Sequence, residues 1–168
     1  MKTHNKWNTI RWKECEQLLA ENQNDLVIAT KRGDVKEIKR IQYKMVRMFA
    51  LRALAVRKVT SNRGKRIPGV DGEKWLRSEQ KMKAVEALTD LSHYRPLPVK
   101  RVWLPKPGKT EKRPLGIPTL FDRAVQALFL YAVEPVVETS ADNRSFGFRK
   151  ARSVHDAAEY IRLMCASK

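Results

Sequence analysis

Residues 98–118 read PVKRVWLPKPGKTEKRPLGIP, and their pattern indicates the fold class. The segment 99–104 is rich in β-branched and aromatic residues and lies between two prolines, which predicts a β-strand. A Pro-Gly pair then starts a turn, and residues 112–117 return as a second strand. Apolar residues recur at helical spacing on both sides of this basic hairpin. We therefore expect an α+β fold, in which a mostly helical N-terminal extension precedes a small antiparallel hairpin with packed helices.

Five segments carry the helical spacing. Gly33 ends the first helix, and Asp34 begins the second as an N-cap, with Glu37 completing a capping box. Pro135 is expected to kink or divide the fourth helix, and Ser153 caps the fifth. The five segments are 12–30, 35–59, 78–91, 119–138 and 154–168.

The chain is strongly basic, because 35 lysines and arginines face 18 acids and give a formal net charge of +17. With 42% hydrophobic residues it can bury a core, so it is not a disordered basic tail. Polyanions are the expected partners, since each neutralised phosphate releases a condensed counterion. An anionic membrane surface is the competing interpretation, but the helices carry no insertion face rich in Trp and Phe.

The excess charge is concentrated in three segments. Residues 31–66 carry 13 bases and 2 acids, residues 94–113 carry 7 and 1, and residues 144–152 carry 4 and none. Patches on a helix, a hairpin and an aromatic loop suit a shaped polyanion. We favour the hypothesis that they bind RNA over the alternative that they are only solvated surface. On the second helix the bases project opposite the apolar stripe. The candidate RNA-binding residues are Lys36, Arg40, Lys44, Arg47, Lys58, Arg63, Lys65, Arg66, Arg101, Arg149, Lys150 and Arg152.

Other classes of protein are disfavoured. No stretch approaches the ~20 apolar residues of a membrane span, and the polar start Met1–Asn5 has no apolar signal core behind it. Cys15 and Cys165 lie in helical patterns at opposite ends of the chain, which indicates core thiols in a reducing compartment. Two cysteines and three histidines at scattered spacings predict no metal site. We expect a bacterial cytoplasmic protein, or one of an organellar matrix, and not a secreted one.

One long motif includes the hairpin, and a second includes the last loop. RVWLPKP at 101–107, with KRPLGIPT at 112–119 and Asp122-Arg123 after it, resembles the first conserved block of group II intron-encoded reverse transcriptases, which are also maturases. SFGFRKARSVHDA at 145–157 resembles their second block. Upstream segments resemble the family's N-terminal extension and the block before its fingers, in the family's order. They are WNTIRW at 7–12, LAVRKVT at 54–60 and PGVDG at 68–72.

The resemblance divides the chain into an RNA-binding helical N-terminal extension, residues 1–72, and a reverse-transcriptase fingers subdomain, residues 73–168, truncated before the catalytic palm. It implies an RNA-directed DNA polymerase and intron-splicing maturase that serves retrotransposition. The implied partners are group II intron RNA, the RNA template and the DNA primer.

For the hairpin, the resemblance implies contacts with the incoming nucleotide. Lys106 and Arg113 would meet the triphosphate, and Ile117 would lie against the templating base. Two strands can supply cations on two sides of a triphosphate, Arg as a planar fork and Lys as a mobile point charge. A solvated hairpin rim is the alternative.

The chain departs from the family's pattern in its carboxylates. Polymerase chemistry needs two metal ions held by carboxylates roughly 4 Å apart. The family takes these carboxylates from a strand Asp after the second block and from a Tyr-x-Asp-Asp hairpin, and neither is present. We therefore expect no catalytic residue, metal site or cofactor in this chain, and no polymerisation by the chain alone. Mg²⁺ is expected for the full enzyme.

Three hypotheses follow. The chain is the gripping part of a longer enzyme, or a free-standing RNA-binding splicing cofactor or decayed intron product without polymerase activity. The third hypothesis, an unrelated basic protein of ribosome or nucleoid type, explains the charge but not the ordered motifs. Without a palm, an exposed fingers surface could drive self-association. Phe146 and Phe148 are expected to anchor their loop in the core.

Overall fold

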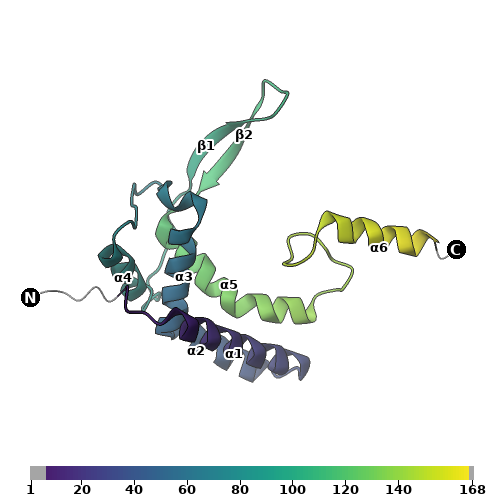
Figure 1. Cartoon of the computed structure of the whole chain (residues 1–168), viewed down its shortest axis with the longest axis horizontal. Helices are drawn as coiled ribbons and strands as arrows, with labels where there is room; N and C mark the ends of the chain where they lie inside the picture. Colours follow the sequence, from purple (N-terminus) through teal and green to yellow (C-terminus); the bar gives the residue numbers. More distant parts are fainter. Residues whose placement is uncertain (1–6, 167–168) are drawn as a thin grey trace, which may run out of the picture.

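The computed structural model describes residues 7–166, so the polar start Met1–Asn5 and the expected helix end at Lys168 lie outside the described residues. Over residues 7–166 the chain forms six α-helices, one 3₁₀ turn and one two-stranded antiparallel hairpin, which confirms the expected α+β class (Figure 1). The elements are α1 (Trp12–Lys31), α2 (Val35–Arg47), α3 (Phe49–Ser61), η1 (Arg63–Arg66), α4 (Ser78–Ala87), β1 (Lys100–Pro105), β2 (Lys112–Ile117), α5 (Leu120–Ser140) and α6 (Val154–Ala166).

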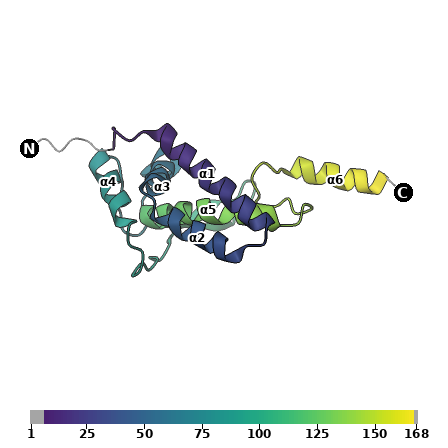
Figure 2. The ribbon, with the colours of Figure 1, turned by 90° about the horizontal axis from the view of Figure 1, so that it is seen from below.

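The hydrophobic core is built around α3 and α5. Nine of the thirteen residues of α3 are buried, and α5 packs along both α3 and α1. The hairpin projects from one end of this helical body, and α6 stands apart from it, as Figures 1 and 2 show. One cluster of buried side chains runs from α1 to α5. The helices on either side of residue 72 therefore share a core, and the predicted division there stays a prediction.

The junction of α1 and α2 follows from its sequence. Gly33 adopts φ +69°, a conformation that glycine reaches without steric cost. Its N–H donates to the Thr30 carbonyl at 3.0 Å, and the next N–H, of Asp34, donates to Ala29 at 3.1 Å, which is the Schellman arrangement. The Asp34 carboxylate accepts the Glu37 N–H at 3.0 Å. The predicted helix end and N-cap are confirmed, whereas the predicted capping box is wrong, because the Asp34 N–H bonds to Ala29 and the Glu37 carboxylate accepts from Arg40.

The prediction of one long helix over 35–59 is wrong, because the helix is interrupted at Met48. This residue has extended backbone angles, φ −70° and ψ 129°, and separates α2 from α3. No glycine or proline marks the break. The physical reason is burial: α3 is apolar nearly all round and turns into the core, whereas α2 stays at the surface.

The helix α5 continues through Pro135 undivided, from Leu120 to Ser140. Proline has no N–H, so it leaves the carbonyl four residues earlier, that of Tyr131, without its usual helical donor. Gln23 of α1 supplies a replacement, because its Nε2 donates to the Tyr131 carbonyl at 3.1 Å. Gln42 of α2 donates in the same way to the next carbonyl at 2.9 Å. Two side chains from neighbouring helices thus stabilise α5 at its proline.

The remaining elements match their predictions closely. The second strand spans 112–117 as expected, and the first begins one residue later than expected. The helix α4 ends at Ala87, four residues before the expected Leu91, although Leu88 is still buried. Ser153 and Asp156 cap α6 reciprocally, as the sequence indicates.

Candidate nucleic-acid interface

The exposed face of α2 carries four of the candidate RNA-binding residues. Lys36, Arg40, Lys44 and Arg47 are all exposed and lie on one helix. Arg40 forms a two-bond ion pair with Glu37, and its hydrogen bonds lower the pKa of that carboxyl. The other bases keep this face strongly positive. The face can therefore neutralise several consecutive phosphates.

Lys58 does not continue this face, because the break at Met48 places it on α3. It is exposed there, with Nζ 5.4 Å from the ring centroid of Tyr131 on α5. A cation over an aromatic ring at this distance is in the range of a cation–π contact. On one helix over 35–59, Lys58 would have shared the basic face with Lys36, Arg40, Lys44 and Arg47; the structure places those four bases on α2 and Lys58 on α3.

Three further candidates lie together on η1. Arg63, Lys65 and Arg66 are exposed on this short turn. Arg123 of α5 fastens the turn, because its guanidinium donates to the carbonyls of Gly64 at 3.2 Å and Ile67 at 2.6 Å. The turn therefore presents three cations from a fixed position beside the first turn of α5.

Gly69 brings the loop after η1 against the start of α5. A Cβ atom at this position would lie 2.7 Å from the backbone of Thr119. Real Cβ atoms do not approach backbone this closely, so only glycine allows this contact. The PGVDG and GIPT motifs, far apart in the sequence, meet here.

The hairpin carries all three candidate nucleotide-binding residues, with Lys106 at the turn and Ile117 at the opposite end of the ladder. Arg113 pairs with Leu104 in the strand register, and Ile117 lies on the same face of β2 because side chains alternate along a strand. Lys106 follows β1 directly, and its Nζ lies 2.7 Å from the Glu111 carboxylate across the turn. Arg101 pairs with Gly116, on the opposite face. The hairpin thus presents cations from both strands.

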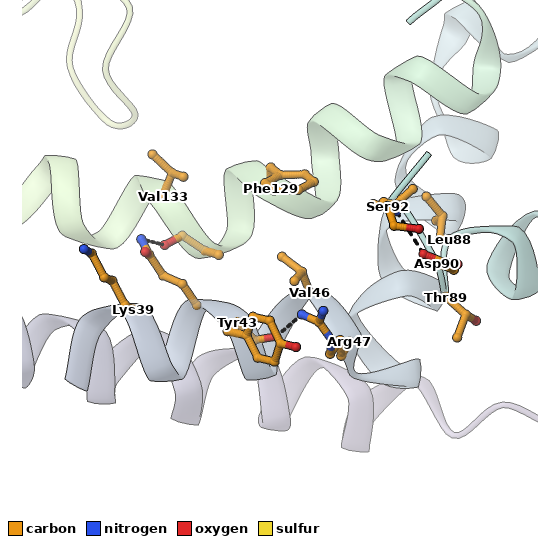
Figure 3. A pocket seen from close by; sticks show the side chains of 13 residues that line it. Lys39, Tyr43, Val46, Arg47, Leu88, Thr89, Asp90, Ser92, Phe129 and Val133 are labelled. Atoms are coloured by element: carbon orange, nitrogen blue, oxygen red, sulfur yellow. Dashed lines mark hydrogen bonds between the residues drawn. The ribbon is translucent and has the colours of Figure 1, made fainter. Parts of the chain in front are cut away.

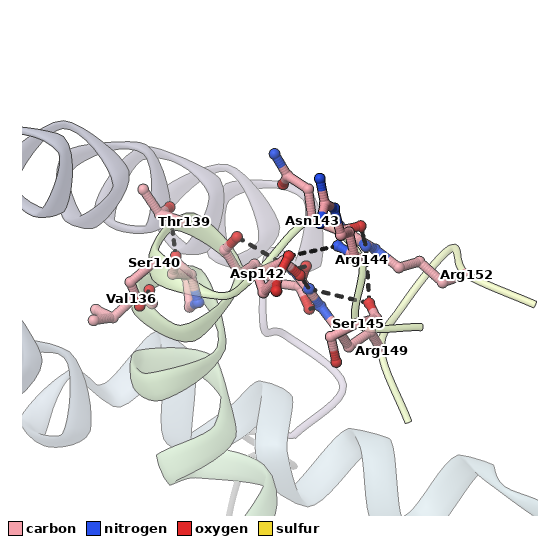
Figure 4. Close-up of polar contacts among 11 residues, drawn as sticks. Val136, Thr139, Ser140, Asp142, Asn143, Arg144, Ser145, Arg149 and Arg152 are labelled. Atoms are coloured by element: carbon pink, nitrogen blue, oxygen red, sulfur yellow. Dashed lines mark hydrogen bonds and ion pairs between the residues drawn. The ribbon is translucent and has the colours of Figure 1, made fainter. Parts of the chain in front are cut away.

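The candidate RNA-binding residues of the loop 142–152 bond to other groups of the same chain. Figure 4 shows this for Arg149 and Arg152. Arg149 forms a two-bond ion pair with Glu138 of α5, with distances of 2.7 and 2.9 Å, and also donates to the carbonyls of Asp142 and Ser145. The hydrogen bonds from Arg149 lower the pKa of Glu138. A fifth bond from Arg149 goes to the Glu138 carbonyl at 3.4 Å, so the geometry favours a structural role for it.

Its two neighbours also make internal contacts. Lys150 forms an ion pair with Glu134 of α5. Arg152 donates to the carbonyls of Asn143 at 2.7 Å and Ser145 at 2.8 Å. RNA binding by these bases stays a prediction, and would compete with the contacts that close the loop.

Two expectations about side-chain burial are wrong. Phe148 is fully exposed, at a left-handed backbone conformation with φ +59°, and Phe146 packs against Tyr160 of α6 with ring centroids 5.8 Å apart. The loop is closed by arginine hydrogen bonds, so it needs no aromatic anchor in the core.

Cys15 is buried as expected, whereas Cys165 is exposed, because α6 buries none of its described residues.

Two further residues of note were not predicted from the sequence. Trp103 lies two residues after Arg101 on the same face of β1 and is 54% exposed, and an exposed Trp beside Arg suits stacking on bases. Arg52 is buried within α3 and donates to the Val85 carbonyl at 3.0 Å and to the Thr89 hydroxyl. Burial lowers the pKa of its guanidinium. The strand alternation could have identified Trp103, whereas only packing identifies Arg52.

The described part of the chain has neither a metal-binding cluster nor a membrane-spanning helix. Residues 7–166 contain no cluster of three His, Cys, Asp or Glu side chains that could bind a metal ion. None of the helices in that range is both long enough and apolar enough to cross a membrane.

A helical body with several exposed basic elements is typical of proteins that bind nucleic acid. Residues 7–88 match the family model described as the N-terminal domain of reverse transcriptase. This part of the chain therefore belongs to that reverse-transcriptase family, and the chain is homologous over its N-terminal part to the curated relatives below, which confirms the resemblance there.

The curated relatives are bacterial. The chain is 42% identical over 115 residues to Protein YkfC of Escherichia coli, an alignment that covers 66% of this chain and 30% of the relative. It is 32% identical over 111 residues to the group II intron-encoded protein LtrA of Lactococcus lactis, covering 65% of this chain and 18% of the relative. The chain thus spans less than a third of either relative.

Proposed function

We propose that this chain is the RNA-gripping N-terminal and fingers part of a group II intron reverse transcriptase and splicing maturase. The observation that carries the proposal is the set of exposed cations on α2, η1 and the hairpin, in a chain homologous to group II intron-encoded LtrA. The bases of α2 and η1 bind phosphates of intron RNA and template. The protein works where the intron RNA is made, in a bacterial cytoplasm or an organellar matrix.

In the complete enzyme the hairpin contacts the incoming nucleotide. Lys106 and Arg113 bind its triphosphate, and Ile117 contacts the templating base. The placement of these three residues on one hairpin supports this role. Mg²⁺ and the carboxylates that bind it belong to the complete enzyme, so the purified chain should add no nucleotide to a primed template. Robust extension by pure protein would contradict this part of the proposal.

The salt dependence of RNA binding tests the gripping role. We expect log K to fall with log salt with a slope of roughly −4 to −8, because each bound phosphate releases a counterion. Fluorescence anisotropy of a labelled structured RNA measures it. A slope near zero would rule out binding through phosphates.

Charge-reversal variants then identify which basic residues bind the RNA. Replacing the four α2 bases by Glu should weaken binding more than replacing Lys106 and Arg113. A control with the same change of charge outside the three basic segments should keep more affinity than the α2 variant; equal losses would mean that only net charge matters. The test residues are Lys36, Arg40, Lys44 and Arg47, and the control residues are Arg11, Lys13, Lys74 and Lys83.

A further inference from the structure

A pocket lies away from the hairpin, between α2, the turn at residues 88–92 and α5 (Figure 3). Its volume is about 470 Å³, within the range of ligand pockets, which span roughly 300–1,000 Å³. Val46, Leu88 and Ala132 give it an apolar floor. The pocket is therefore large enough and apolar enough to receive a flat, partly apolar ligand.

Each of the two flanking helices contributes an aromatic ring. Phe129 of α5 is 45% exposed and Tyr43 of α2 is 62% exposed, and both line the pocket. The guanidinium carbon of Arg47 lies 3.3 Å from the centroid of the Tyr43 ring, so a cation covers part of that ring. Exposed rings beside a cation are the surfaces on which unpaired bases stack.

The two ends of the pocket carry opposite charges. Lys39 lies at one end and Asp90 at the other, as Figure 3 shows. The carboxylate of Asp90 accepts the Ser92 N–H at 2.9 Å. Hydrogen bonds from Ser92, together with the charge of Arg47, lower the pKa of Asp90. The pocket thus offers an ammonium group at one end and an ionised acceptor at the other.

We propose that this pocket binds a single unpaired nucleotide of an RNA, with the phosphate at Lys39, the base against Phe129 and Tyr43, and an amino group of the base donating to Asp90. The proposal rests on the RNA-binding function above. A free phosphate would be repelled by Asp90 and would gain nothing from the rings. Arg47 lines the pocket, and the other α2 bases lie on the same helix. They contact the backbone on either side of the inserted nucleotide, which gives the charge complementarity that an RNA occupant requires.

Two RNA hairpins test the proposal on the full chain. One carries a single bulged guanosine, and the other has the same stem fully paired. We expect at least fivefold tighter binding of the bulged RNA, because stacking of one base contributes about that factor or more. Phe129→Ala should reduce the preference to less than about twofold by loss of that stacking. The matched control is Leu130→Ala, since Leu130 is 41% exposed on the same helix but does not line the pocket.

Charged variants provide a second readout that does not depend on the ring. Lys39→Ala should reduce the preference for the bulged RNA, whereas Lys44→Ala, on the same helix but outside the pocket, should weaken both RNAs equally. Asp90→Asn should reduce the preference for a bulged guanosine over a bulged uridine, because uracil has no exocyclic amino group.

The outcomes separate the two proposals. Equal affinity of the wild-type chain for bulged and paired RNA would overturn the pocket proposal and leave the gripping function intact. No binding of either RNA would overturn both. If Phe129→Ala changed the sedimentation coefficient and left the RNA preference unchanged, the pocket would bind a second copy of the chain, and the nucleotide proposal would be wrong.

Discussion

Two helices of equal length, α3 and α6, behave in opposite ways. Each has thirteen residues, yet α3 buries nine of them and α6 buries none of those described. The difference lies in their surroundings as much as in their composition, because Ile161 and Leu163 of α6 are as apolar as the buried residues of α3. An apolar side chain contributes to stability only where other elements cover it.

The attachment of α6 is correspondingly different. It joins the helical body through the loop 142–152, where Arg149 binds Glu138 and Phe146 packs on Tyr160. The helix α3 is fixed by burial, and α6 is fixed by a few polar bonds and one ring contact. Substitutions should therefore have global effects in the body and local effects in the C-terminal arm, residues 142–166.

The largest expected effect contrasts two leucines. Leu51→Ala in α3 removes a fully buried side chain and should reduce the free energy of unfolding by about 2–5 kcal/mol. Leu163→Ala in α6 removes a side chain that is 54% exposed and should change it by no more than about 0.5 kcal/mol. Urea unfolding followed by circular dichroism measures both. A similar loss in the two variants would mean that α6 is covered in solution.

A smaller effect contrasts two glycines. Gly69→Ala places a Cβ 2.7 Å from the Thr119 backbone, so the loop or α5 must move, at a cost of roughly 1–3 kcal/mol. Gly147→Ala in the arm meets no atom within 4 Å and should change stability by less than about 0.5 kcal/mol. Thermal unfolding of both variants checks this. An unchanged melting temperature for Gly69→Ala would show that the contact relaxes easily.

The smallest effect is local and depends on pH. Because Arg149 lowers the pKa of Glu138 below its ordinary 4.5, the ion pair stabilises the arm at neutral pH, and this stabilisation is lost as the pH falls through the lowered pKa. The anisotropy of a fluorophore on the exposed Cys165 should therefore fall on acidification, while the body stays folded. Glu138→Gln should give low anisotropy already at neutral pH. A pH profile identical to that of the wild type would mean that this ion pair does not position α6.

Locally encoded features were predictable from the sequence. The prolines and the Pro-Gly turn define the hairpin, and the strand 112–117 has the predicted bounds. Gly33 and Asp34 likewise define the junction of the first two helices, because caps and turns depend on neighbouring residues. Charge counts along the chain also identified the two basic segments that contain exposed basic elements, 31–66 with α2 and η1 and 94–113 with the hairpin, but not the internal contacts made by the bases of 144–152.

Features that depend on packing were not predictable. The break at Met48 has no local signal, because the hydrophobic spacing continues across it and only the burial of α3 requires it. The exposure of Phe148 follows from the arginine bonds that close its loop. The pocket of Figure 3 combines residues from α2, α5 and the turn between them in sequence, which no single stretch encodes.

The packing of α5 on α1 and α3 also fixes an order of events during synthesis. The ribosome completes α3 at Ser61 and starts α5 only at Leu120. Until α5 emerges, the apolar surfaces of α1 and α3 that it covers remain open to water and to other nascent chains. Folding of the N-terminal helices is therefore completed by a helix made much later, and pulsed hydrogen exchange during refolding should show α1, α3 and α5 gaining protection together.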